Sequence, residues 1–362
     1  MKKIRILYTI PNFDTAGSGK VVYDLIKYLD KSTFEVFLMC NHSKGTLFDA
    51  IKELEVHITI QQVSFPRTPY FSLFKRIKPY KEFVKKNKID VVHSWHWSSD
   101  WTEILAAKWG GSKFIYTKKA MSWGNLHWKI KSYLASFIIT INHEMVRFFP
   151  WKKQQALIPL GIDTSYYIPE DTTQIRNHEV FRIITVANLV PVKGIEYLIQ
   201  AVHDLQNQQI LIEIVGDTRD SYVRELEALV VKLSLENQVV FKGKHKDVRT
   251  FFRDADLYVI PTRNMGRKEG MPMALVEAMS MGVPVIGSNI SGINYVLKDF
   301  PELIFEPDSA GAIAQKIKFI YQLKHEERLL LGKNLRNYVI DHFSMDKFIN
   351  AHEQLYKELI SR

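Results

Sequence analysis

The sequence predicts an α/β protein with two doubly wound parallel sheets, and three observations support this prediction. Short runs rich in Val, Ile and Leu alternate with longer stretches of helical periodicity, which is typical of parallel strands covered by helices. The chain has 362 residues, more than one hydrophobic core usually supports. A polar stretch without periodicity, Tyr166 to Gln174, separates two halves of similar architecture.

Predicted strands occur in both halves. We expect them at residues 4–10, 34–40, 89–94, 113–117, 137–141, 155–159, 182–187, 210–215, 239–242, 257–260 and 284–287. One domain is predicted over residues 1–165 and a second over residues 166–345. Ligands of such sheets bind outside the carboxyl ends of the strands, where the strand order reverses. The loops that follow the strands are therefore the places to look for a site.

The composition is that of an ordinary globular protein, with 46% hydrophobic and 24% charged residues. The single cysteine, Cys40, follows an apolar run and predicts a buried structural thiol in a reducing compartment. The apolar start is short and contains Arg5, so we interpret it as a strand and not as a signal peptide. No stretch approaches the roughly 20 apolar residues that span a bilayer. We expect a cytoplasmic protein.

The segment from Glu269 to Gly287 is the most informative part of the chain. Glu269 precedes Gly270 and Pro272 in a tight loop, and Pro272 suits the first position of a helix that carries Glu277. The start of such a helix offers unpaired N–H groups and the positive end of a dipole, a site for a diphosphate. Eight helical residues rise roughly 12 Å, whereas glycosidase carboxylates stand about 5 to 9.5 Å apart, so the spacing disfavours a hydrolase.

In this segment and several others the sequence resembles the retaining, nucleotide-sugar-dependent glycosyltransferases of family 4. The matching motifs are Ile158–Asp163, Lys193-Gly194, Ile214–Asp217, Val240–Gly243, Ala255–Pro261 and the segment from Glu269 to Gly287. The resemblance implies the GT-B fold, in which two Rossmann-like domains face a cleft. It implies an acceptor-binding domain over residues 1–165, a donor-binding domain over residues 166–345, and a last helix of residues 346–362 that packs back on the first domain.

The resemblance also implies the donor-side residues. Glu277 would hold the ribose hydroxyls, Glu269 would contact the donor sugar as a catalytic residue, and the backbone N–H groups along Gly270, Met271, Pro272 and Met273 would hold sugar and phosphate. Lys193 matches the family's phosphate-binding and catalytic lysine. Asn188 stands where relatives have an arginine and can donate only a neutral hydrogen bond to the donor. Arg263, Arg267 or Lys268 would then neutralise the phosphates, and solvated loop charges are the favoured alternative for these three residues.

On the acceptor side the chain both matches and departs from the family. Gly17 and Gly19 match a glycine loop beside the donor phosphates, although a plain turn is an alternative. His93 matches a histidine often catalytic in relatives, and His96 follows it; core or surface roles are the alternative for both. Where many relatives have Thr-x-His-Gly, this chain has Thr117, Lys118, Lys119 and Ala120, which makes Lys118 or Lys119 the substitute on the acceptor side.

We expect no metal and no cofactor beyond the nucleoside diphosphate sugar. Asp254 and Asp256 have the spacing of a metal-binding Asp-x-Asp, but they lie between a helix end and a buried strand. The predicted reaction moves a sugar to an acceptor hydroxyl with retention, in polysaccharide, lipopolysaccharide or glycolipid biosynthesis. A nucleotide-sugar epimerase and a non-catalytic module that binds nucleotide sugars or polyanions are the alternatives.

Charge is distributed unevenly. Residues 1–165 hold 25 Lys and Arg against 13 Asp and Glu, and the rest of the chain is nearly neutral. Basic and aromatic residues alternate in residues 71–88, and a second such zone runs from Trp123 to Lys153. The pattern suits an anionic membrane surface, a solvated helix face over core aromatics, or nucleic acid. Given the resemblance we favour the inner face of the cell membrane, with a glycan or lipid-linked acceptor and no nucleic acid partner.

Overall fold

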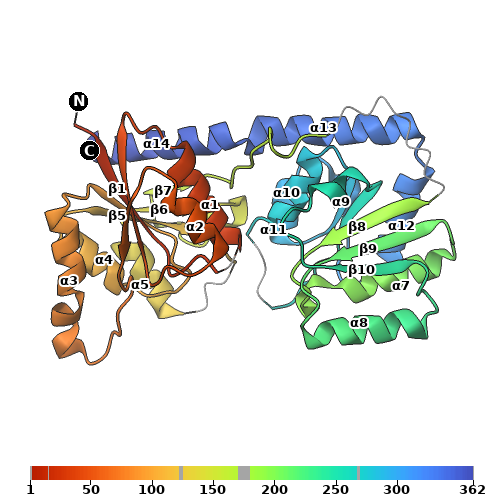
Figure 1. Ribbon diagram of the computed structural model, residues 1–362, viewed down its shortest axis with the longest axis horizontal. Coiled ribbons are helices and arrows are strands. Elements are labelled where there is room, and N and C mark those ends of the chain that lie inside the picture. Colours follow the sequence, from red (N-terminus) through yellow and green to blue (C-terminus); the bar gives the residue numbers. More distant parts are fainter. Residues whose placement is uncertain (1, 15, 122–124, 170–179, 267–269, 362) are drawn as a thin grey trace. The chain divides into compact units, whose positions relative to one another are not determined.

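The computed structural model describes residues 2–14, 16–121, 125–169, 180–266 and 270–361. The chain divides into two compact units. Unit 1 comprises Met1–Gly161 and Asp346–Arg362, and unit 2 comprises Ile162–Met345. Each unit contains one sheet in which all paired strands are parallel, with helices on both of its faces (Figure 1). The predicted class of two doubly wound α/β domains is confirmed.

The sheet of unit 1 has seven strands in the order β3-β2-β1-β4-β5-β6-β7. They are β1 (Ile4–Thr9), β2 (Phe34–Cys40), β3 (His57–Ile60), β4 (Val91–Ser94), β5 (Lys113–Lys118), β6 (Phe137–Thr140) and β7 (Gln155–Leu157). The strand order reverses between β1 and β4, so the carboxyl ends of these two strands mark the expected binding edge.

Helices cover this sheet and bury apolar stripes against it. They are α1 (Ala16–Tyr28), α2 (Thr46–Lys52), η1 (Tyr70–Ser72), α3 (Leu73–Lys86), α4 (Thr102–Trp109), α5 (Leu126–Leu134), α6 (His143–Val146) and α14 (Met345–Ser361). In α3 the buried residues are Leu73, Ile77, Tyr80 and Val84, a spacing that places them on one face of a helix. The opposite face of α3 carries its lysines.

The sheet of unit 2 has six strands in the order β10-β9-β8-β11-β12-β13 and reverses between β8 and β11. The strands are β8 (Phe181–Val186), β9 (Ile210–Val215), β10 (Val239–Gly243), β11 (Leu257–Ile260), β12 (Val285–Ser288) and β13 (Ile304–Phe305). The helices are η2 (Pro191–Lys193), α7 (Ile195–Leu205), α8 (Ser221–Lys232), α9 (Arg249–Arg253), α10 (Met273–Ser280), α11 (Ser291–Val296), η3 (Pro301–Leu303), α12 (Ala310–Gln322) and α13 (His325–Phe343).

The units divide before Ile162, four residues earlier than the predicted boundary after residue 165. Ile162 forms a parallel bridge with Ser344. Its N–H donates to the Phe343 carbonyl at 2.8 Å, and its own carbonyl accepts from Met345 N–H at 2.8 Å. Because these bonds tie residues 162–165 to the end of α13, this short segment belongs to unit 2.

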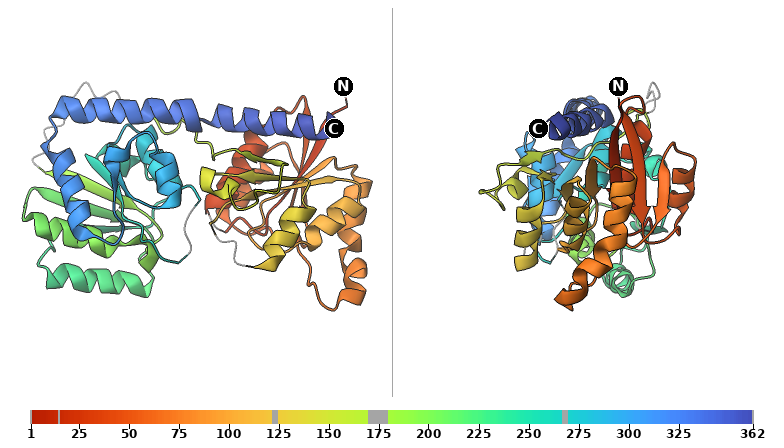
Figure 2. Two further views of the ribbon diagram at one scale, coloured as in Figure 1. Left: turned by 180° about the vertical axis from the view of Figure 1, so that it is seen from behind. Right: turned by 90° about the vertical axis from the view of Figure 1, so that its left-hand side faces the viewer.

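Helix α14 returns to unit 1 after the chain has completed unit 2, and it runs beside the first strands there (Figure 2). Its Phe348, Tyr356 and Leu359 are buried. The Tyr356 hydroxyl lies 3.0 Å from that of Tyr8 in β1. In the described residues no helix combines the length and the apolar character needed to cross a bilayer.

Candidate active site

Helix α10 begins one residue later than the sequence predicts. Pro272 is the N-cap, with φ −80° and ψ 107°, and Met273 is the first helical residue. Proline at the cap removes no donor from the helix, since the first free N–H groups come from Met273 onward. Gly270, Met271 and Pro272 are buried directly before the helix. Glu269, Arg267 and Lys268 lie outside the described residues.

Glu277, one turn into α10, is held by a residue that the sequence analysis missed. The Tyr167 hydroxyl donates a hydrogen bond to the Glu277 carboxylate, and burial together with this negative charge raises the pKa of Tyr167. Tyr167 is itself fixed, because its carbonyl accepts from Ser280 Oγ at 2.7 Å and from Arg336 Nη1 at 2.9 Å. The start of the predicted linker is therefore part of the site.

Lys193 lies at a close approach between two loops of unit 2. Gly194 follows it with φ +66°, and a Cβ there would stand 2.2 Å from the carbonyl oxygen of Pro261. The Val192 carbonyl also accepts from Arg263 N–H at 2.8 Å. Only glycine fits this contact, so Lys193 is held beside the loop that leads from β11 toward α10. Asn188, after β8, is exposed.

Arg263, one of the cations considered for the donor phosphates, is paired with two carboxylates. Its Nε donates to Asp308 at 2.7 Å and its Nη1 to Glu196 at 3.2 Å. The hydrogen bond to Asp308 is the main reason why the pKa of Arg263 is raised. Two carboxylates therefore already neutralise this guanidinium.

Two buried hydroxyls lie near the carboxyl ends of β11 and β12. The side chains of Thr262 and Ser291 are 3% and 6% exposed, and neither hydroxyl has a partner within the described chain. An unpaired buried hydroxyl is costly, so both are candidates for hydrogen bonds to a ligand. The only sequence signal was their position directly after a strand.

In unit 1, Gly17 and Gly19 lie within the first turn of α1 and not in a loop before it, as the sequence analysis had placed them. A Cβ on Gly17 would meet no atom within 4 Å, whereas one on Gly19 would come 3.1 Å from both Phe13 and Leu47. Gly17 thus leaves the backbone at the helix start open, and Gly19 serves packing.

Lys118 and Lys119 differ in their surroundings. Lys118 is buried, with Nζ 3.9 Å from the centre of the Trp128 ring. Lys119 donates to Ser18 Oγ at 2.9 Å and to the Trp95 carbonyl at 2.5 Å. It therefore ties the end of β5 to the first turn of α1 and to the residue that follows β4.

His93 lies inside unit 1. Its Nδ1 is 2.7 Å from the Tyr356 hydroxyl and its Nε2 is 2.8 Å from Thr117 Oγ1. Its side chain has no exposed surface, and burial holds its pKa well below the usual value. This neutral ring joins β4, β5 and α14. The geometry gives His93 a packing role and offers neither nitrogen to a substrate.

His96 is half-buried on the loop after β4. Burial, with the charges of Lys131 and Lys119 adding to it, lowers its pKa to about 3. Its Nδ1 accepts from the Ser98 N–H at 3.1 Å, so the proton of the neutral ring is on Nε2. His96 can therefore donate a hydrogen bond to an acceptor substrate, but its outer nitrogen is not a base.

A buried network that the sequence analysis missed lies at the same edge. The Glu103 carboxylate accepts from Thr9 Oγ1, from Ser94 Oγ at 2.7 Å and from the Tyr80 hydroxyl at 3.3 Å. Burial raises the pKa of Glu103. It lowers the pKa of Lys131 to about 8, an effect that Glu103 opposes. The network joins the carboxyl ends of β1 and β4.

In the part of the chain that the structure describes, no three carboxylate, imidazole or thiol groups are placed to hold a metal ion. The elements of unit 2 that the sequence analysis assigned to the diphosphate are the start of α10 and Lys193, and the polar groups of unit 1 lie at the ends of β1, β4 and β5.

Solved structures define the class of protein. A glycosyltransferase from Rickettsia africae ESF-5 matches with a TM-score of 0.87 at 20% identity, covering 99% of each chain. HepE from Anabaena, solved with UDP, matches with a TM-score of 0.81 at 17% identity, covering 98% of this chain and 100% of HepE. At such identities the likeness establishes the fold, which is the GT-B fold.

Family models define the family. The model for Glycosyl transferases group 1 matches residues 170–338, and the model for Glycosyltransferase Family 4 matches residues 15–166. The chain belongs to the family 4 glycosyltransferases.

Curated relatives agree with this assignment. N-acetyl-alpha-D-glucosaminyl L-malate synthase of Bacillus anthracis is 28% identical over 62% of this chain and 58% of its own length. UDP-Gal:alpha-D-GlcNAc-diphosphoundecaprenol alpha-1,3-galactosyltransferase of Escherichia coli is 23% identical over 95% of this chain and 94% of its own. With most of the other curated relatives the match spans about half of the relative's length or less.

Proposed function

We propose that this protein is a retaining glycosyltransferase that transfers a sugar from a nucleoside diphosphate sugar to an acceptor hydroxyl in polysaccharide, lipopolysaccharide or glycolipid biosynthesis. The observation that carries the proposal is the Glu277 carboxylate, held by Tyr167 one turn inside α10. Such a carboxylate can accept hydrogen bonds from two hydroxyls of a ribose, and the start of the helix can bind a diphosphate. HepE from Anabaena has been solved in complex with UDP and with UDP-glucose, which makes UDP the first nucleotide to test.

Catalysis would come from positioning and from stabilising the charge of the leaving diphosphate by α10 and Lys193. The bond between the anomeric carbon and the diphosphate oxygen breaks, and a bond from that carbon to the acceptor oxygen forms on the same face. The acceptor proton passes to the leaving phosphate, which requires no base from the protein. This assignment suits a buried, neutral His93, and the reaction needs no divalent cation.

Calorimetry with UDP, GDP and ADP tests the donor site. Wild type should bind one of them, and Glu277→Ala should weaken that binding at least tenfold. Release of nucleoside diphosphate that depends on an added glycan acceptor separates a transferase from an epimerase or a binding module. The anomeric configuration of the product, read by NMR, tests retention. A product with inverted anomeric configuration would contradict the mechanism. So would a slower release of nucleoside diphosphate in EDTA than in magnesium.

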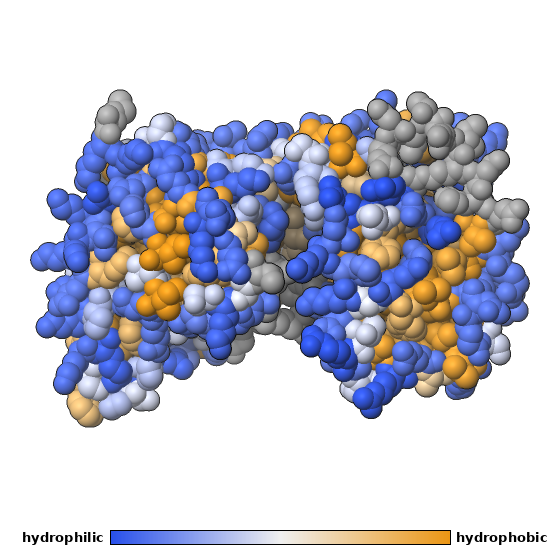
Figure 3. All heavy atoms as spheres, in the orientation of Figure 1, coloured by the Kyte–Doolittle hydropathy of each residue, from blue (hydrophilic) through white to orange (hydrophobic). Residues whose placement is uncertain are grey.

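We also propose that the α3 face of unit 1 meets an anionic membrane surface. Phe71 and Phe74 are 90% and 59% exposed, so these aromatics are not core residues. Lys75, Lys78, Lys81, Lys85 and Lys86 lie on the same helix. Figure 3 shows hydrophilic side chains with a few apolar ones among them on the surface that α3 forms. Aromatic and basic side chains together suit the interface of anionic lipids.

The second basic and aromatic zone, which runs from Trp123 to Lys153, is partly buried, and Trp123 itself lies outside the described residues. Trp128, Lys131, Phe149 and Lys152 are all buried. Lys152 donates to the Ala135 carbonyl at 2.6 Å. Lys129, Arg147, Trp151 and Lys153 are exposed, so only part of this zone packs in the core, and the expectation that it faces a membrane stays a prediction. Sedimentation with anionic vesicles should be weakened by Phe71→Ser and left unchanged by Tyr133→Ser, which changes a 74% exposed aromatic on α5.

A further inference from the structure

A cavity of about 560 Å³ opens in unit 1 at the carboxyl ends of its strands. One wall is the loop of residues 62–70 after β3, a second is residues 98–100 after β4, and a third is His127 near the start of α5. Nothing in the proposed donor site uses these residues. Their position at the binding edge of the sheet, and the polar character of the walls, mark the cavity as a ligand site.

Arg67 is the residue in this cavity whose polar groups are least satisfied. Its side chain makes no hydrogen bond or ion pair with any described residue, and its Nη1 is buried without a partner. A guanidinium has five N–H donors and keeps its charge at all relevant pH values. An unpaired buried donor is costly. A bound anion would accept from this guanidinium and remove that cost.

The loop that carries Arg67 is fixed from behind by Arg76 of α3. The Arg76 guanidinium donates to the carbonyl oxygens of Pro66 at 2.8 Å, Arg67 at 3.1 Å and Pro69 at 3.0 Å. The donors of Arg76 are thus used by backbone carbonyls, and those of Arg67 remain for a ligand. The geometry of the loop is set before any ligand arrives, which lowers the cost of binding.

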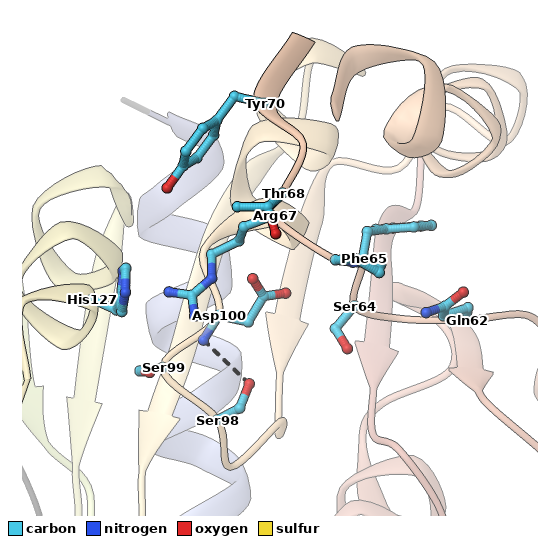
Figure 4. Close-up of a pocket in the computed structure, with 11 residues that line it drawn as sticks. Gln62, Ser64, Phe65, Arg67, Thr68, Tyr70, Ser98, Ser99, Asp100 and His127 are labelled. Atoms are coloured by element: carbon cyan, nitrogen blue, oxygen red, sulfur yellow. Dashed lines mark hydrogen bonds between the residues drawn. The ribbon is translucent and has the colours of Figure 1, made fainter. Parts of the chain in front are cut away.

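Other donors converge on the same space. Figure 4 shows the Arg67 guanidinium and the Tyr70 hydroxyl pointing toward the space that His127 faces from the other side. The Trp101 Nε1 donates to His127 Nδ1 at 3.3 Å, so Nε2 is the nitrogen of His127 that can donate to a ligand. Beneath the wall, the buried Lys131 donates to the Ser98 carbonyl at 2.9 Å.

Asp100 is the one carboxylate among the described residues that line the cavity. It accepts from the Thr102 hydroxyl at 2.6 Å and from the Thr102 N–H at 3.2 Å. These bonds direct it to the start of α4. The ligand that fits the remaining groups is therefore an anion and not a cation.

We infer that this cavity binds the anionic group of the acceptor, a phosphate or a carboxylate, with Arg67 as its main ligand and Tyr70 and His127 as further donors. The inference rests on the proposed function, in which unit 1 receives the acceptor. It names the chemical class of that acceptor, since the sugar-accepting hydroxyl must belong to a molecule that carries a negative charge. The diphosphate of the donor has its own proposed site in unit 2.

Calorimetry on the full chain tests this with inorganic pyrophosphate and with succinate, in the presence of saturating UDP so that the donor site is filled. Arg67→Gln should weaken binding of at least one of the two anions about ten- to a hundredfold, the loss expected when a charge-assisted hydrogen-bonded partner is removed. Arg67→Lys should lose less. The matched control is Arg147→Gln, which removes the same charge from an exposed position in unit 1.

Three outcomes would overturn the inference. They are no binding of either anion by the wild type, wild-type binding by Arg67→Gln, and an equal loss in Arg147→Gln. If Arg67→Gln does not fold, Tyr70→Phe provides a second test, because it removes one exposed hydroxyl and should weaken binding about threefold. Failure of the proposed function is distinguishable, since the wild type would then fail to bind any of the three nucleotides while the Arg67-dependent binding of the anion would persist.

Vesicles identify the source of the anion. Sedimentation is compared for phosphatidylcholine vesicles with and without phosphatidic acid. Retention that needs phosphatidic acid and is lost in Arg67→Gln but kept in Arg147→Gln assigns a lipid headgroup. Binding of the soluble anions without such retention assigns a soluble phosphate or carboxylate, and either result supports the site.

Discussion

The bond between Tyr167 and Glu277 provides the sharpest test of the donor site. Tyr167→Phe removes one oxygen atom and keeps the ring in place. The hydroxyl donates to the Glu277 carboxylate, and because burial and that carboxylate raise the pKa of Tyr167 it stays protonated at any physiological pH. A hydrogen bond to a charged group contributes about 1.5–3 kcal/mol. Loss of the Tyr167 hydroxyl would leave the Glu277 carboxylate in place but less well oriented, so only part of this energy would be lost from ribose binding.

We therefore expect the affinity for UDP to fall about three- to tenfold, which corresponds to about 0.7–1.4 kcal/mol. The free energy of unfolding should fall by about 1–2 kcal/mol, since the carboxylate loses a buried partner. Calorimetric titration measures the first quantity and urea denaturation the second. Glu277→Ala, which removes the proposed contact itself, should cost more affinity than Tyr167→Phe.

Tyr166→Phe is the matched control, because it makes the same change one residue away. The Tyr166 ring lies under the Arg249 guanidinium, 3.7 Å from its carbon, and its side chain is 44% exposed. Its hydroxyl has no role in the proposed site, so UDP affinity should not change. The reasoning would be refuted if Tyr167→Phe bound UDP as tightly as the wild type, or if Tyr166→Phe lost as much.

Three further predictions concern stability. Gly194→Ala should lower the free energy of unfolding by at least about 3 kcal/mol, because the new Cβ would clash with a backbone oxygen and the position has a positive φ. The control is Gly243→Ala, which has φ +75° and open space around it and should cost only about 1–2 kcal/mol. Equal losses of the two variants in thermal denaturation would contradict the clash. Glu103→Gln should destabilise the fold by about 1–3 kcal/mol in urea denaturation, because the carboxylate accepts three buried hydrogen bonds that an amide cannot accept equally well, and the loss should be smaller in the double variant with Lys131→Met, which removes the buried cation that Glu103 stabilises. Burial lowers the pKa of His352 to about 4, so as the pH falls this histidine is protonated in the unfolded chain before it is protonated in the folded one. The free energy of unfolding should therefore fall by about 3 kcal/mol between pH 6.5 and pH 4. This pH dependence should be shallower in His352→Asn.

Much of the fold was predictable from the sequence, because buried parallel strands are continuous apolar runs. All eleven predicted strands occur within two residues of their expected limits. Strands β3 and β13 were missed. Strand β3 is a sheet edge whose His57 and Ile60 are exposed, so it lacks the apolar run of a central strand, and β13 has only two residues.

The site was predictable only where its chemistry is local in sequence. Glu277 and Lys193 stand in motifs, but the partner of Glu277 comes from Tyr167, which is distant along the chain and sits in a segment that reads as a linker. For the same reason the sequence did not indicate that His93 meets Tyr356 of the last helix. Partners separated by a hundred or more residues are set by topology, and no local pattern encodes them.

The buried charged residues of unit 1 are explained by the groups that they hold in place. Burying a charge is costly, and the pKa shifts of Glu103 and Lys131 show that burial opposes both charges. Yet Glu103 fixes Ser94 at the end of β4, and Lys131 fixes the carbonyl of Ser98 in the next loop. Ser98 lines the cavity that contains Arg67, and Ser94 Oγ accepts from the His96 N–H in the loop that leads to this wall. An apolar replacement would keep the core filled and release that wall, so the pair contributes to the shape of the proposed acceptor site more than to the free energy of folding.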